Sequence, residues 1–225
     1  PNQIRSNPAL ASAAERLADV ARALCSSAAP NLDLRGYTIL SELGRGVMGV
    51  VYLARQERLG GRPVAIKILP PHIAGSLSAR ARFKAEVMSV ARQRHAGIVS
   101  VYDIVEDGET LAYVMEWVDG VTLQQIIDAL VDRPDTTARM SVLRELLGAP
   151  VADATFYTFV ARIGATIARA LHAVHASGIL HRDVKPSNCF VDADGTVKIG
   201  DFGLSISTAI RTEPALTATR MCLGT

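Results

Sequence analysis

The chain has 225 residues, of which 49% are hydrophobic and 20% charged, and its formal net charge is +2. This composition is apolar enough for a folded core and too apolar for a disordered chain. The small net charge excludes a broad basic surface, so we do not expect nucleic acid as the main partner. No apolar run approaches the ~18 residues that span a bilayer.

The first 35 residues form an alanine-rich extension. Their apolar residues recur at helical spacing between Asn7-Pro8, a start signal, and Pro30, a stop signal. This pattern predicts a helix that packs on another part of the protein.

The next segment predicts a small β-rich unit. Tyr37 to Leu69 contains three strands, Tyr37–Leu43, Val50–Arg55 and Pro63–Leu69. A helix from Ala79 to Arg94 follows, with an apolar stripe. That stripe consists of Phe83, Val87, Val90 and Ala91. The runs Ile98–Val105 and Leu111–Trp117 then predict a strand pair around a Glu-Asp-Gly turn.

The second half predicts mainly helices. One spans Leu123–Leu130, and the longest spans Phe156–Ala176, with Gly178 as its C-terminal cap. Residues 132–154 between them are more polar and predict an insertion with a short helix near Met140–Leu147.

A glycine-rich motif lies in the first predicted hairpin. Gly44, Gly46 and Gly49 read G-x-G-x-x-G and are flanked on both sides by β-branched and aromatic residues. A dinucleotide-binding loop would instead join a strand to a helix. Glycines here let the backbone approach a phosphate group, because no Cβ intervenes. Lys67 follows in the apolar strand Val64–Leu69, where a lysine needs an anionic partner.

A second motif brings catalytic residue types close together. His181-Arg182-Asp183-Val184-Lys185-Pro186-Ser187-Asn188 is followed, after a strand-like run, by Asp201-Phe202-Gly203. It contains a carboxylate that could accept a proton, a lysine beside it, and an amide and a carboxylate that could bind a divalent cation. Phosphoryl transfer needs these groups, because it depends on positioning and charge stabilisation.

In this order, the motifs resemble those of the eukaryotic-like protein serine/threonine kinases. The run Leu-Gly-Arg-Gly-x-Met-Gly-Val-Val-Tyr-Leu-Ala is similar to the bacterial branch of that family. The resemblance covers residues 36–225 and implies an α+β, bilobal protein-kinase fold. It places an N-terminal extension at 1–35, the small lobe at 36–116 and part of the large lobe at 117–225, with an activation segment at 201–225.

The resemblance also implies roles for individual residues in ATP- and Mg²⁺-dependent phosphoryl transfer. Asp183 would accept the proton of the attacking hydroxyl, and Lys185 would neutralise charge on the γ-phosphate. Lys67 would hold the α and β phosphates and pair with Glu86. Asn188 and Asp201 would hold Mg²⁺. His181 and Phe202 are expected to pack in the core.

The expected nucleotide contacts lie in the glycine-rich loop, the adjoining strands and the hinge Met115-Glu116-Trp117-Val118. They are Leu43, Gly44, Gly46, Gly49, Val51, Ala65, Lys67, Met115, Glu116, Val118 and Phe190.

The resemblance extends to regulation and partners. Arg182 precedes the proposed base, and Thr217-Ala218-Thr219 resembles the paired threonines that bacterial relatives autophosphorylate. A phosphate there would pair with Arg182 and order the loop. We expect protein substrates with serine or threonine hydroxyls, and a homodimer as one route to autophosphorylation. The family normally continues beyond Thr225 with further helices, so we expect residues 1–225 alone to be weakly active or inactive.

The number and spacing of the cysteines indicate the redox state of the compartment in which the protein works. Cys25, Cys189 and Cys222 lack the spacing of metal ligands or paired disulfides. We therefore expect a reduced, cytoplasmic location, with a membrane anchor outside these residues left open.

Two other function classes are compatible with parts of the pattern. A non-catalytic nucleotide-binding module would share the loop, although the polar residues of every motif are intact. A small-molecule phosphotransferase would share Asp183 and Asn188, but Lys185 and Asp201-Phe202-Gly203 count against it.

Overall fold

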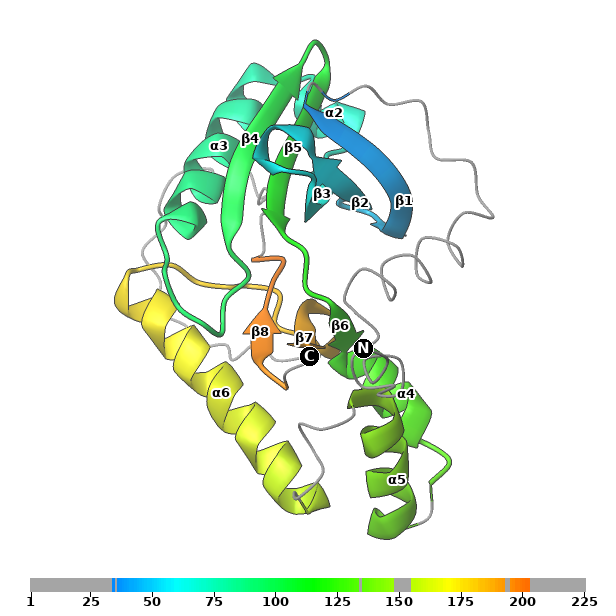
Figure 1. Cartoon of the computed structure of the whole chain (residues 1–225). Coiled ribbons are helices and arrows are strands. Elements are labelled where there is room, and N and C mark those ends of the chain that lie inside the picture. Colours follow the sequence, from blue (N-terminus) through cyan, green and yellow to red (C-terminus); the bar gives the residue numbers. More distant parts are fainter. Residues whose placement is uncertain (1–33, 35, 134, 148–154, 193–194, 203–225) are drawn as a thin grey trace.

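The structure is a computed structural model, and it describes residues 34, 36–133, 135–147, 155–192 and 195–202. These residues form two lobes, with a five-stranded antiparallel sheet in the upper lobe and helices around a small sheet in the lower one (Figure 1). The α+β, bilobal fold predicted from the sequence is thereby confirmed. The predicted N-terminal helix lies outside the described residues.

The upper sheet has the strand order β1-β2-β3-β5-β4. Its strands are β1 (Tyr37–Gly46), β2 (Gly49–Gln56), β3 (Arg62–Ile68), β4 (Val101–Asp107) and β5 (Thr110–Glu116). Alternating side chains divide the sheet into two faces. One face buries Ala54, Val64, Ile66, Ala112 and Val114. The other turns Ala65, Tyr113 and Met115 toward helix α3 and the lower lobe.

Helix α3 (Leu77–Ala91) packs against this second face, beside β4 in Figure 1. The Ser76 side chain caps its first turn by accepting a hydrogen bond from the Ala79 amide. Phe83, Val87 and Val90 are buried as predicted, but Ala91 is exposed and Ala79 takes its place in the buried stripe. The helix ends at Ala91, three residues before the predicted end at Arg94. The short helix α2 (Pro71–Ala74) precedes it.

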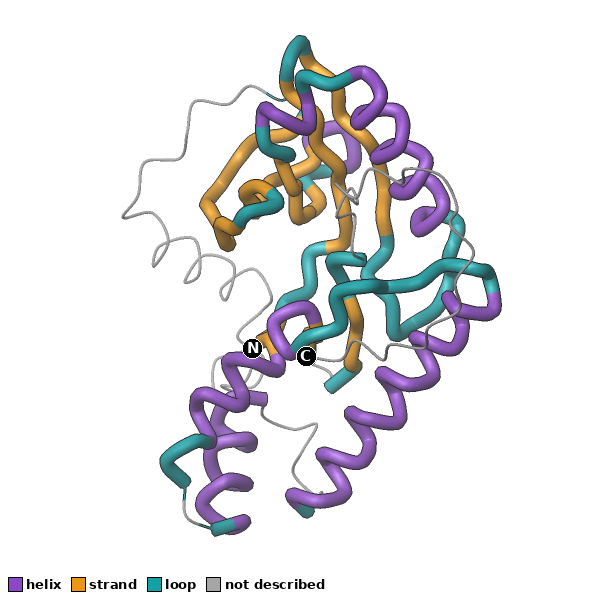
Figure 2. Tube along the Cα trace, turned by 180° about the vertical axis from the view of Figure 1, so that it is seen from behind, coloured by secondary structure: helices purple, strands orange, loops and turns teal. Residues whose placement is uncertain are grey.

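The lower lobe contains the helices α4 (Leu123–Leu130), α5 (Thr136–Leu147) and α6 (Phe156–Ala176), seen from behind in Figure 2. Helices α4 and α6 begin with capping boxes, in which Thr122 pairs with Gln125 and Thr155 with Thr158. Gly178 follows α6 in the left-handed region (φ 74°), as its predicted capping role requires.

Helix α5 lies within the segment predicted as an insertion, and it contributes to the lower core. Its Met140, Leu143 and Leu147 are buried against Phe159 and Ile163 of α6. The short predicted helix is therefore present, begins earlier than expected, and supports α6.

A three-stranded sheet lies between the helices and the upper lobe. Its strands are β6 (Gly120–Thr122), β7 (Cys189–Asp192) and β8 (Val197–Ile199), in the order β6-β7-β8. The 3-10 turn η4 (Pro186–Asn188) leads into β7. This sheet positions two residues of the second sequence motif, because Asn188 directly precedes β7 and Asp201 follows β8.

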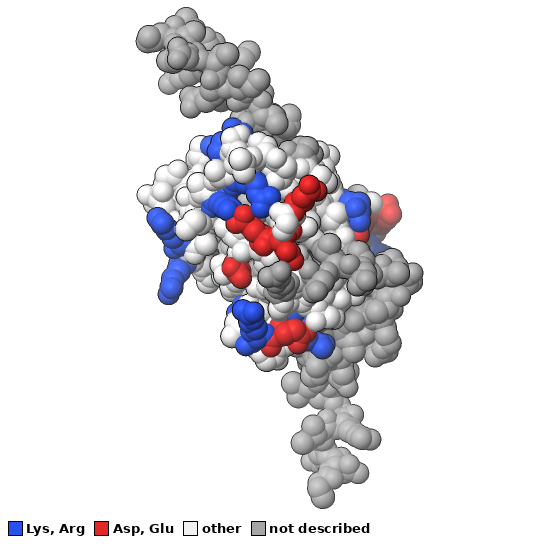
Figure 3. Space-filling model, turned by 90° about the horizontal axis from the view of Figure 1, so that it is seen from above, with Lys and Arg blue, Asp and Glu red and all other residues white. Residues whose placement is uncertain are grey.

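Among the described residues, no helix is both long and apolar enough to cross a membrane. Basic and acidic side chains are interspersed on the face seen from above (Figure 3). This mixture agrees with the small net charge of the chain.

Candidate active site

Two adjoining cavities lie where the lobes meet. The hinge cavity, of about 310 Å³, is bounded by the ends of β5 and β7. It is lined by the predicted adenine-side residues Leu43, Val51, Ala65, Met115, Glu116, Val118 and Phe190. The structure thus places these residues around one mostly apolar space, as a nucleotide base requires.

The loop cavity, of about 560 Å³, lies under the glycine-rich turn between β1 and β2. It is lined by the predicted polar residues Gly44, Gly46, Gly49, Lys67, Asp183, Lys185, Asn188 and Asp201. The two cavities share Gly44, Val51, Ser187, Asn188 and Asp201. A ligand with an apolar end and a charged end can therefore extend from one into the other.

Glycine is favoured at the three positions of the turn for different physical reasons. Gly49 has φ 115°, and a Cβ there would lie 1.9 Å from the Ile68 carbonyl oxygen. The fold itself therefore requires glycine at this position. A Cβ added at Gly44 or at Gly46 would meet no atom within 4 Å. Their lack of a side chain leaves space beside the cavity, which suits a bulky phosphate ligand.

Asp183 is held by two neighbours within the same motif. Its Oδ2 accepts hydrogen bonds from Lys185 Nζ at 2.8 Å and from Asn188 Nδ2 at 3.0 Å. Burial would raise the pKa of the Asp183 carboxyl, but these hydrogen bonds outweigh it and hold that pKa below its ordinary value. Asp183 is therefore a carboxylate at neutral pH, able to accept a proton or orient a hydroxyl.

Lys67 lies on the opposite side of the loop cavity and pairs with Asp201. Its Nζ is 2.6 Å from Asp201 Oδ1. The same oxygen accepts a hydrogen bond from the Tyr113 hydroxyl at 2.9 Å. Asp201 has φ 55°, so its backbone is in the left-handed region, which is uncommon for a residue other than glycine. The anionic partner expected for Lys67 is therefore present, but it is Asp201.

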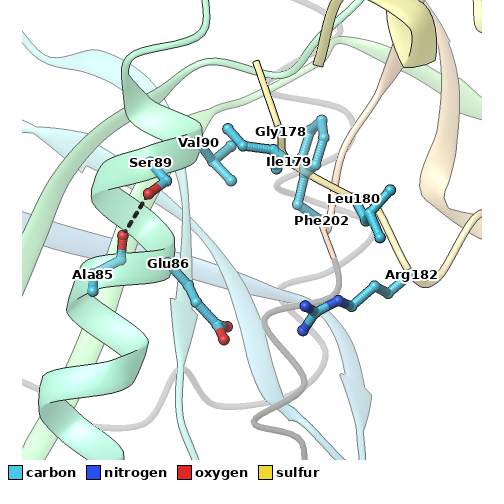
Figure 4. Close-up of a pocket in the computed structure, with 9 residues that line it drawn as sticks. All are labelled: Ala85, Glu86, Ser89, Val90, Gly178, Ile179, Leu180, Arg182 and Phe202. Atoms are coloured by element: carbon cyan, nitrogen blue, oxygen red, sulfur yellow. Dashed lines mark hydrogen bonds between the residues drawn. The ribbon is translucent and has the colours of Figure 1, made fainter. Parts of the chain in front are cut away.

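Glu86 lies apart from Lys67 in this structure. The structure gives Lys67 an ion pair with Asp201 and, within the described part of the chain, none with Glu86. The carboxylate instead lines a third cavity, where it points toward Arg182 beside Phe202 (Figure 4). Burial raises the pKa of Glu86, while the nearby Arg182 and Arg82 oppose that rise. The pairing of Lys67 with Glu86 implied by the resemblance therefore differs from the observed arrangement.

His181 and Phe202 support the site from below, as expected. Their side chains are buried, and the ring centroids lie 4.5 Å apart. His181 Nε2 is 3.0 Å from the Gly200 carbonyl oxygen, and its Nδ1 accepts from the Asp183 amide at 3.3 Å. A neutral ring with the proton on Nε2 satisfies both contacts. Burial lowers the pKa of His181, in agreement with the neutral form.

The residues expected to hold Mg²⁺ have suitable oxygen atoms. The Asn188 amide nitrogen donates to the backbone and side chain of Asp183, which leaves the amide oxygen for another partner. Asp201 keeps Oδ2 beside the oxygen that accepts from Lys67 and Tyr113. Mg²⁺ is commonly held by one or two protein oxygens together with phosphate oxygens and water, so this pair fits. Among the described residues, no three His, Cys, Asp or Glu side chains cluster in a way suited to a metal.

Tyr113 is the functional candidate that the sequence motifs do not contain. The alternation along β5 puts it on the same face as Met115, since the two are separated by one residue. That spacing was a signal for a side chain directed toward the cleft. Gly203 and the threonines Thr217 and Thr219 lie outside the described residues.

Comparison with known proteins agrees with this site. The protein kinase domain family matches residues 37–223, and the chain therefore belongs to that family. It is 34% identical to a probable serine/threonine-protein kinase, PknB, of Lactococcus lactis, over 84% of this chain and 26% of that protein. It is 34% identical to the serine/threonine-protein kinase PknL of Mycobacterium tuberculosis, over 86% of this chain and 42% of that protein.

Solved structures show the same fold. The kinase domain of Mycobacterium tuberculosis PknI superposes with a TM-score of 0.59 at 29% identity, over 80% of this chain and 63% of that one. The chain spans 26% of the length of the Lactococcus lactis relative and 42% of the length of the Mycobacterium tuberculosis PknL.

Proposed function

We propose that the chain is the catalytic part of a protein serine/threonine kinase, which transfers the γ-phosphate of ATP to hydroxyl groups of proteins. The observation that carries this proposal is the loop cavity, where Asp183 with Lys185 and Asn188 faces Lys67 with Asp201. The hinge cavity beside it has an apolar lining of the kind that takes a nucleotide base.

The residues divide the reaction between them. The adenine would lie between Val51 and Ala65 above and Phe190 below, with the phosphates under the glycine-rich turn. Lys67 would bind the phosphates, and Asp183 would orient the acceptor hydroxyl and accept its proton. Lys185 would balance charge on the transferred group. Asn188 and Asp201 would hold Mg²⁺, which supplies positive charge against the phosphate oxygens.

We also propose that phosphorylation of the activation segment regulates this activity through Arg182. Arg182 lies beside the catalytic motif with φ 63° and its guanidinium points toward Glu86 (Figure 4). A phosphate on Thr217 or Thr219 would compete with Glu86 for that guanidinium, since both are anions. Autophosphorylation would then free Glu86 from Arg182, so that Glu86 could pair with Lys67. In a homodimer, one copy of the chain would phosphorylate the other.

The test is the substitution Asp183→Asn in the full-length protein. We expect phosphate transfer to a generic protein substrate to fall by about 10²–10⁴-fold, the usual contribution of a general base. ATP affinity should stay near the wild-type value, because Asp183 is assigned to the acceptor hydroxyl. Asp132→Asn, at an exposed position outside both cavities, is the matched control.

The outcomes separate the three function classes. Near wild-type transfer by the Asp183→Asn protein would reject the assignment of the base. Wild-type protein that binds ATP without transferring it would favour a non-catalytic module. Transfer to small hydroxyl compounds but not to proteins would favour a small-molecule phosphotransferase.

A further inference from the structure

The Tyr113 hydroxyl reaches the site from the centre of the upper sheet. Tyr113 is 2% exposed, and the register between β3 and β5 places it opposite Lys67. Its hydroxyl and the Lys67 ammonium group both donate to Oδ1 of Asp201, at 2.9 Å and 2.6 Å. One carboxylate oxygen therefore has two donors from adjacent strands.

The hydroxyl needs this partner in order to be buried. A phenol oxygen removed from water costs free energy unless it forms a hydrogen bond, whereas an apolar side chain would fill the same space without that cost. The Asp201 carboxylate supplies that partner, and the phenol hydroxyl acts as the donor to its Oδ1.

The ring is fixed independently of the carboxylate. Tyr113 belongs to a strand paired on both sides, by β3 and by β4. Its ring also packs on Phe83 of α3, with 5.8 Å between centroids and an interplanar angle of 47°. A donor held this rigidly can define where its acceptor lies, because little side-chain freedom remains to be lost.

We propose that Tyr113 is a positioning residue for Asp201, holding Oδ1 so that Oδ2 is presented to Mg²⁺. This rests on the proposed function, in which Lys67 binds the phosphates of ATP. Once Lys67 turns to those phosphates, the Tyr113 hydroxyl remains as the donor that keeps the Asp201 carboxylate in place. The tyrosine thereby prepares the metal ligand before and during nucleotide binding.

The decisive variant is Tyr113→Phe in the full-length protein, because it keeps the ring and its contact with Phe83. ATP binding is measured by calorimetry across a Mg²⁺ titration. We expect the apparent Mg²⁺ affinity in the presence of ATP to weaken by about tenfold, as for the loss of a hydrogen bond to a charged acceptor. ATP binding without Mg²⁺ should be unchanged. Tyr102→Phe, in β4 of the same sheet, is the control for removing a hydroxyl.

A second measurement needs neither metal nor nucleotide. Melting temperatures are compared for Tyr113→Phe, Asp201→Ala and the double variant. If the two side chains are bonded, the double variant should lose less stability than the two single losses added together. Additive losses would mean that Tyr113 and Asp201 act independently, and would overturn the proposal.

The outcomes also distinguish this inference from the proposed function. If the wild type shows no Mg²⁺-dependent tightening of ATP binding, the proposed function fails, and with it the basis for this inference. If the wild type tightens and Tyr113→Phe tightens equally, only the positioning role is wrong. A lower melting temperature with an unchanged Mg²⁺ dependence would show that Tyr113 is merely structural.

Discussion

Each carboxylate of the loop cavity has its own cation. Asp183 is paired with Lys185, and Asp201 with Lys67. Two unpaired carboxylates in one cavity would raise each other's pKa and repel a polyphosphate. With each charge balanced, the cavity can accept an anionic ligand and a divalent cation together. Because each aspartate has its own partner, the effect of mutating one can be measured separately from the effect of mutating the other.

Asp201→Ala is predicted to remove the Mg²⁺-dependent tightening of ATP binding, because it deletes the proposed carboxylate ligand of the ion. It also leaves Lys67, which is 8% exposed, without the partner seen here. The measurement is calorimetry of ATP binding with and without Mg²⁺. The control is Asp132→Ala, which removes an exposed carboxylate outside both cavities. An unchanged Mg²⁺ dependence would assign the ion to other residues.

The sequence predicted which candidate site residues gather around the two cavities, but it predicted their partners only in part. The spacing of Asp183, Lys185 and Asn188 puts them in one short turn, so their contacts follow from local sequence. The partner of Lys67 depends on how α3 and the end of β8 are placed, which no local pattern specifies. The residues alone predicted a lysine with an anionic partner, and the resemblance implied Glu86 for that role, whereas the structure pairs Lys67 with Asp201.

Helix α3 is joined to the upper sheet by charge as well as by its apolar stripe. Glu106 of β4 accepts from Arg80 Nη2 at 3.0 Å and also pairs with Lys84. Arg80 lies in the first turn of α3 and Lys84 at its middle, two residues before Glu86. These ion pairs attach the helix to β4 at positions that precede Glu86.

Glu106→Gln is predicted to loosen this attachment. We expect the melting temperature to fall by about 1–4 °C at low salt, since exposed ion pairs contribute little each. The difference from wild type should shrink in high salt, because exposed charges are screened. Glu109→Gln, exposed in the same hairpin, is the control. A difference that is the same at low and high salt would contradict an electrostatic attachment.

The same variant has a defined pH dependence. Hydrogen bonds from Lys84 and Arg80 lower the pKa of Glu106 from its ordinary 4.5. A carboxylate with a lowered pKa in the folded state stabilises the fold above its ordinary pKa, and that contribution is lost as the pH falls through the lowered value. Wild type and Glu106→Gln should therefore differ at pH 7 and converge in acid.

The two lobes are connected by more than the hinge segment. The Val99 amide donates to the Ile199 carbonyl, and the Ile199 amide to the Gly97 carbonyl, each at 2.9 Å. In the hinge itself, Glu116 pairs with Lys198 of β8. The segment after α3 thus attaches the small sheet of the lower lobe to the upper lobe, directly behind the hinge cavity.

Sequence reasoning predicted the larger elements and missed this connection. The five strands of the upper sheet and helix α6 have long periodic patterns, which identified them. Strands β6, β7 and β8 have three or four residues each, and β6 is separated from β7 by three helices. The sequence showed a strand-like run between Asn188 and Asp201, but patterns this short do not reveal which strands pair. Their pairing is decided by tertiary packing, in which Val191 and Val197 join the core of α4, α5 and α6.

The ion pair at the hinge gives the last prediction. Lys198 and Glu116 have side-chain exposures of only 18% and 22%, and Glu116 Oε2 also accepts from the Ser100 amide at 3.2 Å. Lys198→Met keeps most of the apolar stem but leaves the Glu116 carboxylate without its cation. We expect a loss of about 1–3 kcal/mol in the free energy of unfolding, less than for a fully buried pair because water still reaches the site. ATP affinity should also fall, since Glu116 lines the hinge cavity. Thermal melting and calorimetry measure the two effects, with exposed Arg94→Met as control.

Adding Glu116→Gln to Lys198→Met should recover part of the stability, because it removes the uncompensated charge. If the double variant is no more stable than Lys198→Met, the pair does not act through its charges and the connection rests on the backbone hydrogen bonds alone.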